Sequence, residues 1–331
     1  MTELIVPGII TSVIAFFTVY FSMPPLIKIL HKNNQAVRDI HKKGEVMVVR
    51  PAGPSLILGV IASEAVLYAF LQLNEILAII FTTAIAFLIG YVDDKRVMGG
   101  WFKPIGLAVA ALPIIFLGAY ESDLAFPLFG AVQIPILYIA IIIFMIVITG
   151  NTINSIDVAN GIASGFMVIS GFSLSIALFI LQNYEIAIAS LPLGFIALAF
   201  YKYHKIPSKI FPGDSGALTF GAMYGAIAIV GQVEVIAAVA LLPAILNSFL
   251  FLASVKRIVE HRELNHKPVE LTEDFKLRAT NDKKARISLV RLIVAGKALS
   301  EREVAIAIFK LALFSGVLAI ITAFMMEVKL Q

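Results

Sequence analysis

Polar residues of the kinds that bind metal ions and phosphate groups interrupt an otherwise apolar chain. They form five short clusters between long apolar runs: Asp39-Ile40-His41-Lys42, Asp93-Asp94, Asn151 to Asn160, Pro212-Gly213-Asp214-Ser215 and His261-Arg262. Carboxylate and carboxamide oxygens are ligands for divalent cations, and Lys and Arg pair with phosphate. If all five clusters lie on one face of a membrane, the sequence predicts a site where a metal ion and a phosphorylated substrate meet.

The composition indicates an integral membrane protein. Of the 331 residues, 60% are hydrophobic and only 15% are charged, and the mean hydropathy is +0.94. The chain has no cysteine, which excludes disulfides, thiolate nucleophiles and Cys-ligated zinc. The first apolar run has no basic segment before it and no small-residue cleavage site, so we interpret it as a retained span.

Apolar runs long enough to cross a bilayer predict an all-α polytopic protein with about ten spans. The expected spans are 4–30, 53–71, 76–92, 104–120, 133–150, 161–182, 186–201, 215–231, 235–256 and 303–327. We expect residues 1–331 to form one transmembrane catalytic domain.

The connections between these spans differ sharply in charge. Four of them, 28–50, 95–103, 202–209 and 256–302, hold 24 of the 26 Lys and Arg residues, and the alternate connections hold none. Because positive charge stays on the cytoplasmic side, we expect these four loops in the cytoplasm and both termini outside. The same bias argues against nucleic acid as a partner, and it would arise in any ten-span protein whatever its chemistry.

The loop 256–302 is the longest connection, and residues 268–277 and 285–292 in it alternate roughly by twos. This alternation predicts a small hairpin before the last span. Ser300-Glu301-Arg302-Glu303 fits a capping box at the start of that span.

Asp93 and Asp94 follow the third apolar run, at a helix end whose dipole disfavours negative charge. They need a compensating cation, either a neighbouring basic residue or a metal ion. An ordinary solvated helix end is the alternative explanation. Lys103, just before the fourth span, fits phosphate binding or anchoring at the membrane surface.

The stretch from Asn151 to Asn160 is the most informative one. Asn151, Asn154 and Asp157 follow one another at intervals of three, so in a helix they share a face. Asn160 begins the next span, where free backbone N–H groups favour anions. Helix capping and interhelical hydrogen bonds are the structural alternative, but four such side chains between apolar helices are costly without partners.

Two further clusters complete the set. Asp214 opens the eighth span, as a helix cap or as a metal ligand, and Phe211 before it offers a flat apolar surface for a base. His261 and Arg262 suit a helix C-terminus, and an arginine also suits a phosphate or pyrophosphate.

In this order and on one face, these residues resemble the polyprenyl-phosphate N-acetylhexosamine-1-phosphate transferases. The resemblance rests on Asp93-Asp94, Asn151 to Gly161, Gly213-Asp214 and His261-Arg262, and it extends over essentially the whole chain. It implies that a polyprenyl or dolichyl phosphate attacks the β-phosphorus of a UDP-sugar and releases UMP.

The resemblance also implies roles for individual residues. Asn154 and Asp214 would bind Mg²⁺, with Mn²⁺ as the other candidate ion, and Lys103 and Arg262 would neutralise the pyrophosphate. Asn160 and Phe211 would hold uracil, and His261 and Arg262 would reach the sugar. Asp93 and Asp94 would be catalytic, with Asp93 orienting the lipid phosphate. Asn151, Asp157, Asp39 and Lys42 complete the expected substrate-binding set.

Two departures from the muramyl-peptide members favour UDP-N-acetylglucosamine or a close relative as the donor. The last cytoplasmic loop lacks a run of consecutive histidines, and Asn160 stands where those members have an acid. A phospho-N-acetylmuramoyl-pentapeptide donor stays the alternative, and an ion-coupled transporter is the alternative from another class. A transporter should hold its carboxylates near the bilayer midplane, and only Glu64 fits that. The resemblance further implies a multi-pass protein of the plasma membrane, or of the endoplasmic reticulum in a eukaryote, with a cytoplasmic site and a possible homodimer.

Overall fold

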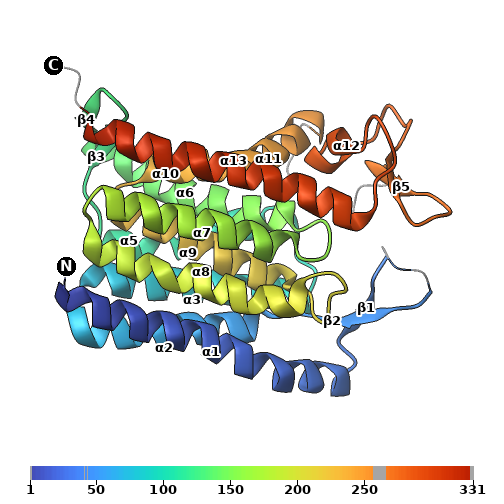
Figure 1. The fold of residues 1–331 in the computed structure, drawn as a ribbon, viewed down its shortest axis with the longest axis horizontal. Helices are drawn as coiled ribbons and strands as arrows, with labels where there is room; N and C mark the ends of the chain where they lie inside the picture. The colour runs from blue at the N-terminus through green and yellow to red at the C-terminus, as the bar shows by residue number, and fades with distance from the viewer. Residues whose placement is uncertain (1, 41, 43, 256–265, 329–331) are drawn as a thin grey trace.

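The protein is a bundle of long helices, as the sequence predicts. The computed structural model describes residues 2–328 except 41, 43 and 256–265. Its main helices are α1 (Thr2–Lys32), α2 (Gly53–Leu71), α3 (Asn74–Lys95), α4 (Phe102–Ala110), α5 (Leu112–Phe116), α6 (Pro135–Ile156), α7 (Ile162–Ile180), α8 (Tyr184–His204), α9 (Gly213–Val230), α10 (Glu234–Ala240), α11 (Leu242–Val255) and α13 (Glu301–Glu327). Figure 1 shows the longest of these helices, such as α1, α7, α8 and α13, lying side by side along one long axis.

The helices have the length and surface of membrane spans. Within the described residues, seven helices are long and apolar enough to cross a bilayer, and α10 with α11 would add an eighth as one span bent by 76°. Large apolar side chains face outward around the bundle, among them Phe21, Phe144 and Phe314, which are 62–65% exposed. The protein is therefore a multi-pass membrane protein. The expected number of ten spans stays a prediction. The two further segments, α4–α5 and α9, are helical but do not reach the length or hydropathy of the other spans.

Local sequence explains where several helices begin. Pro54 and Pro135 stand in the first turns of α2 and α6, where a missing N–H costs nothing. Ser300 and Glu303 form the predicted capping box at the start of α13, each side chain accepting the other's backbone N–H.

Helix α9 occupies the centre of the bundle. Every residue from Asp214 to Val230 is buried, and α3 and α6 pack closely on its sides. Gly90 of α3 makes this approach possible, because a Cβ there would stand 2.5 Å from the Cα of Ser215. The first turn of α9 is thereby held between the ends of α3 and α6.

Within the described residues, three small antiparallel hairpins lie at the two ends of the bundle. Ala36–Arg38 (β1) pairs with Met47–Val49 (β2), and Asp123–Phe126 (β3) pairs with Gly130–Gln133 (β4). Val269–Leu271 (β5) pairs with Leu277–Ala279 (β6). The hairpin of the 256–302 loop thus closes within its first alternating segment. The second segment leads instead into a short helix, α12 (Leu289–Ile293), because Ser288 caps it by accepting the N–H of Arg291.

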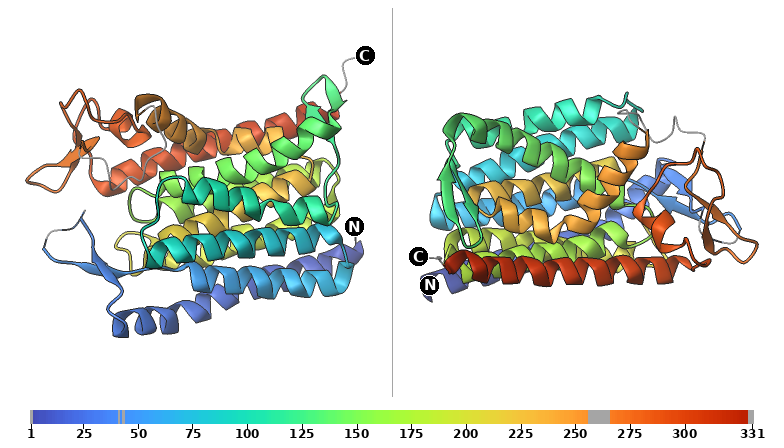
Figure 2. Two further views of the ribbon diagram at one scale, coloured as in Figure 1. Left: turned by 180° about the vertical axis from the view of Figure 1, so that it is seen from behind. Right: turned by 90° about the horizontal axis from the view of Figure 1, so that it is seen from above.

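The two ends of the bundle differ, as Figures 1 and 2 show. Helix α1 begins and α13 ends at the end that also carries β3 and β4. The β1–β2 hairpin, the β5–β6 hairpin and α12 lie together at the other end. The arrangement gathers the basic loops at one end, and which side of the membrane that end faces stays a prediction.

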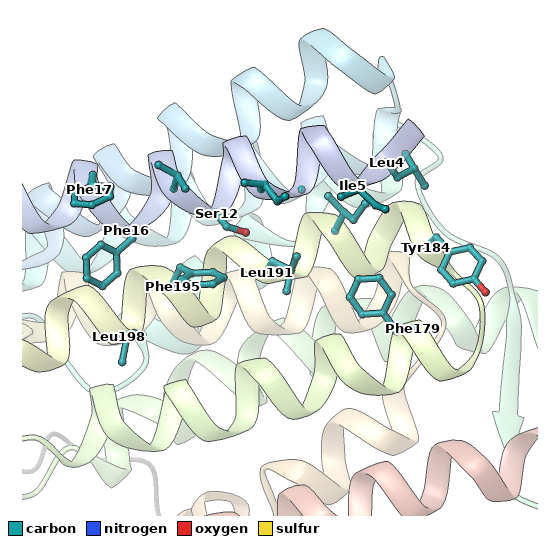
Figure 3. Close-up of a pocket in the computed structure, with 14 residues that line it drawn as sticks. Leu4, Ile5, Ser12, Phe16, Phe17, Phe179, Tyr184, Leu191, Phe195 and Leu198 are labelled. Atoms are coloured by element: carbon teal, nitrogen blue, oxygen red, sulfur yellow. The ribbon is translucent and has the colours of Figure 1, made fainter. Parts of the chain in front are cut away.

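An apolar cavity lies toward the end of the bundle where the described chain starts and finishes. It measures about 660 Å³ and is lined by α1, α7 and α8, from Leu4 and Tyr184 to Phe17 and Leu198 (Figure 3). Its walls carry none of the polar residues that the sequence singles out, so it is separate from the candidate site.

Candidate active site

A buried group of charged side chains lies where α3, α4, α6 and α9 come together. The Nζ of Lys103 is 2.5 Å from Oδ1 of Asp214 and 3.0 Å from Oδ2 of Asp93. Asp93 also accepts the backbone N–H of Met98 at 2.9 Å. The three side chains are at most 11% exposed. Two carboxyl groups and one ammonium thus meet at one buried point, and a cation bound there would gain carboxylate oxygens as ligands.

Asn154 joins this cluster from the last turn of α6. Its side chain lies within interaction distance of the Asp214 carboxylate, so two residues sixty positions apart in the chain are brought together. Asn151, one turn earlier, instead donates to the carbonyl of Val147 on its own helix at 2.8 Å. The face shared by Asn151 and Asn154 therefore brings only Asn154 to Asp214.

Asp94 positions the start of α9. Its two oxygens accept the N–H groups of Asp214 and Ser215, each at 2.9 Å, and the hydroxyl of Ser215 at 2.7 Å. A carboxylate at a helix N-terminus satisfies free N–H groups and favours the dipole. Gly213 makes this approach possible: its φ is +67°, and a Cβ there would lie 2.7 Å from an oxygen of Asp94. The contacts of Asp94 are those of a residue that holds Asp214 in place.

The oxygen ligands at this point suit a cation that is shared with a substrate. Among the described residues, no three His, Cys, Asp or Glu side chains are grouped so that they could enclose a metal ion. Asp214 and Asn154 supply two kinds of oxygen ligand, with Asp93 beside them. Mg²⁺ typically takes one or two protein ligands and completes its octahedron with phosphate oxygens and water. The donor set therefore fits Mg²⁺ held together with a phosphorylated substrate.

Asp157 lies between α6 and α7, in a second polar group, where its side chain is 20% exposed and that of His204 is 1% exposed. Its Oδ1 is 3.7 Å from Nε2 of His204, whose Nδ1 is 2.9 Å from the hydroxyl of Ser164. Burial raises the pKa of the Asp157 carboxyl to about 7, although the N–H of Ala163 partly offsets the effect. Near neutral pH this carboxyl can therefore both donate and accept a hydrogen bond.

The raised pKa of Asp157 predicts a pH-dependent stability. Between about pH 4 and 7, Asp157 is protonated in the folded protein and ionised in the unfolded chain. Its contribution to the free energy of unfolding is therefore fully present below about pH 4 and is lost as the pH rises through about 7. We expect Asp157→Asn to flatten this decline. Thermal unfolding of both proteins in detergent between pH 4 and 8 measures it, and parallel curves would contradict the assignment.

The first basic loop and α13 meet at Asn160. The Nδ2 of Asn160 donates to Oδ2 of Asp39 at 2.8 Å, and its backbone N–H donates to Oε1 of Glu301 at 3.0 Å. The other oxygen of Glu301 pairs with the ammonium of Lys42. The structure thus brings Asp39, Lys42 and Asn160 together, as members of one network.

Two cavities adjoin along the loop 157–160. The smaller one, of about 210 Å³, is lined by Arg38, Asp39, Ile40, Arg50, Asp157, Val158, Ala159, Asn160, His204, Phe211 and Gly213. The larger one, of about 480 Å³, extends from Asn154 and Asp157 past Asn247 and Phe251 to His266, Lys267 and Arg286. Because Asp157 to Ala159 line both cavities, the two cavities are neighbours on either side of this loop.

The structure adds two residues, Glu301 and His204, that the sequence motifs do not reveal. In the sequence, Glu301 is recognisable only as an acidic residue in the first turn of a helix. His204 is recognisable only as one more polar residue at the end of a span. The signal available for both is their position next to a basic loop. His261 and Arg262 lie outside the described residues.

The fold and the candidate site together define the class of protein. The protein is a multi-pass helical membrane protein with a buried cluster of carboxylates, a carboxamide and a lysine at one end of the bundle, beside two adjoining cavities.

Comparison with known proteins shows the family to which the chain belongs. Residues 76–232 match glycosyl transferase family 4. A Methanocaldococcus jannaschii protein, provisionally named a glycosyltransferase, is 30% identical over 284 residues, which are 86% of each chain. A Saccharolobus solfataricus protein, provisionally named a UDP-N-acetylglucosamine–dolichyl-phosphate N-acetylglucosaminephosphotransferase, is 28% identical over 72% of this chain and 75% of its own. A phospho-N-acetylmuramoyl-pentapeptide-transferase of Limosilactobacillus reuteri is 28% identical over 67% of this chain and 74% of its own. The chain belongs to glycosyl transferase family 4.

Proposed function

We propose that this protein transfers N-acetylglucosamine-1-phosphate from UDP-N-acetylglucosamine to a polyprenyl or dolichyl phosphate in the membrane, giving a lipid diphosphate sugar and UMP. The observation that carries the proposal is the meeting of Asp93, Lys103, Asn154 and Asp214 beside two adjoining cavities. The names of two relatives describe transfer of a sugar phosphate or of its peptide-bearing counterpart.

The two cavities suit the two ends of such a donor. The smaller one offers Phe211 for stacking and Asn160 for hydrogen bonding to a base. The larger one combines Asn154, Asn247 and Ser288 with apolar walls, which matches a sugar that carries hydroxyls and an acetyl methyl group. The pyrophosphate between base and sugar would then lie near the loop 157–160 and the Lys103 cluster.

The reaction forms one phosphorus–oxygen bond and breaks another. An oxygen of the lipid phosphate attacks the β-phosphorus of the donor, and the bond to the oxygen shared with the α-phosphorus breaks as UMP leaves. A phosphate monoester has a second pKa near ~6, so the acceptor is already largely dianionic at neutral pH. Asp93 is therefore assigned to orienting the acceptor rather than to removing a proton from it.

Charge stabilisation is the main contribution of the site. Lys103 would neutralise oxygens of the pyrophosphate, and Asp94 would hold the first turn of α9 so that Asp214 stays in place. Mg²⁺, with Asn154 and Asp214 as its protein ligands, would stabilise the charge on the transferring and leaving phosphates. Water-excluding helices around the cluster strengthen each of these interactions.

The test is exchange of labelled UMP into UDP-N-acetylglucosamine by the purified protein with a polyprenyl phosphate. We expect exchange that requires the lipid, that stops when EDTA removes divalent cations, and that returns with Mg²⁺. Lipid products from a panel of UDP-sugars, read by mass, identify the sugar. Product from the muramoyl-pentapeptide donor alone would contradict the proposed sugar. Absence of exchange with every donor would contradict the proposed reaction and is the result expected of an ion-coupled transporter.

A further inference from the structure

Asn160 is fixed from two sides by acids that lie far from it in the sequence. Its side-chain Nδ2 donates to Asp39 and its backbone N–H donates to Glu301, at 2.8 and 3.0 Å. Asp39 and Asn160 are each 2% exposed, and Glu301 is 6% exposed. Hydrogen bonds to buried carboxylates are stronger than neutral ones, so Asn160 has little freedom to turn.

Glu301 also fixes the loop that carries Asp39. One of its oxygens accepts from Asn160, and the other pairs with Lys42, three residues after Asp39. The backbone N–H of Lys42 donates to the carbonyl of Asp39 at 3.3 Å, which closes this turn. The first residue of α13 therefore ties together both partners in the Asp39–Asn160 hydrogen bond.

The direction of the Asp39–Asn160 bond decides what Asn160 can offer a ligand. A carboxylate only accepts hydrogen bonds, so the NH₂ group of the carboxamide must face Asp39. The carbonyl Oδ1 is then turned away from Asp39, and no described residue donates to it. Asn160 lines the smaller cavity together with Phe211, so it presents an acceptor to a base stacked there.

We infer that Asp39 and Glu301 are positioning residues that hold Asn160 as an acceptor and thereby select uracil over cytosine in the donor. N3 of uracil carries a hydrogen and donates to such an oxygen. N3 of cytosine is itself an acceptor and opposes it. This inference rests on the proposed function, and it concerns how the donor's base is chosen.

Direct binding of UMP and CMP to the purified full-length protein, in detergent with Mg²⁺, tests the inference without turnover. We expect the wild-type protein to bind UMP more tightly than CMP. In Asp39→Asn the new carboxamide can donate to Asn160, which lets the Asn160 side chain flip. The UMP preference over CMP should then fall by about tenfold, the order expected for one misdirected buried hydrogen bond.

Two variants at Glu301 separate its contacts. Glu301→Gln keeps an acceptor for the N–H of Asn160 but loses the ion pair with Lys42, whereas Glu301→Ala loses both. We therefore expect UMP affinity to fall in the order wild type, Gln, Ala, with the KM for the lipid acceptor unchanged. Glu303→Gln is the matched control, because glutamine serves equally in a capping box and should leave UMP binding as it is.

The outcomes are distinguishable. An unchanged UMP to CMP ratio in Asp39→Asn, or a Glu303→Gln variant as weak as Glu301→Gln, would overturn the inference while leaving the proposed function standing. A wild-type protein that binds neither nucleotide would overturn both. If thermal unfolding shows that Glu301→Ala does not fold, the Asp39→Asn and Glu301→Gln variants still test whether Asp39 and Glu301 position Asn160.

Discussion

Asp214→Asn is expected to lower UMP release by about 10³-fold while the protein stays folded. The substitution keeps the shape of the side chain but removes the charge that Lys103 contacts at 2.5 Å and that the proposed Mg²⁺ requires. Loss of one preorganised charge at such a site costs about 10²–10³ in turnover, and loss of a metal ligand adds to it.

Turnover of the purified variant, with its thermal unfolding as a check on folding, measures this effect. Asp93→Asn serves as the informative neighbour: donor binding should stay largely intact while turnover falls sharply, because Asp93 is assigned to the acceptor. Asp123→Asn, in the β3–β4 hairpin at the other end of the bundle, is the matched control and should keep its activity. Turnover of Asp214→Asn within tenfold of wild type would refute the assignment of Asp214 as a metal ligand.

Gly90→Ala is expected to disrupt the site without changing a charged residue. The added methyl group would stand 2.5–2.7 Å from backbone atoms of Ser215 and Asp214, which cannot rotate away. Helix α3 must then separate from α9. Overpacking of this kind costs about 1–3 kcal/mol of stability, and a displacement near 1 Å at reacting groups costs about 10²-fold in rate.

Gly99→Ala is the matched control for Gly90→Ala, because a Cβ at Gly99 meets no atom within 4 Å. It should leave both the unfolding temperature and the turnover unchanged. The pair is measured by thermal unfolding and UMP release in detergent. An active, fully stable Gly90→Ala protein would show that the close packing of α3 on α9 does not position Asp214.

The membrane fold follows from composition and from the length of the apolar runs. These are properties of local sequence, because a segment that cannot satisfy its backbone hydrogen bonds in lipid must form a helix. Hence helices occupy the predicted intervals, and the capping box at Ser300 is found where it is expected. The bend between α10 and α11 falls just before Pro243, which cannot continue α10. The end of α6 at Ile156, beyond the expected 150, is not evident in the sequence.

The site was predictable only in part. Residue types and their expected one-sided placement singled out Asp93, Asn154 and Asp214, which the structure brings together. Buried carboxylates and carboxamides require partners wherever the chain goes. Residue types and placement could not separate Asp93, which contacts Lys103, from Asp94, which caps α9. Nor could they show that Asn151 would turn back to its own helix, since i, i+3 spacing fixes a face but not a partner.

By itself, the sequence determined that this is a membrane protein whose polar groups gather at the ends of apolar helices, since hydropathy and charge act residue by residue. Only the tertiary structure decided which of those groups touch. Glu301 and Asp39 reach Asn160 across 141 and 121 residues, and such contacts arise from how helices pack around α9, which no local pattern encodes.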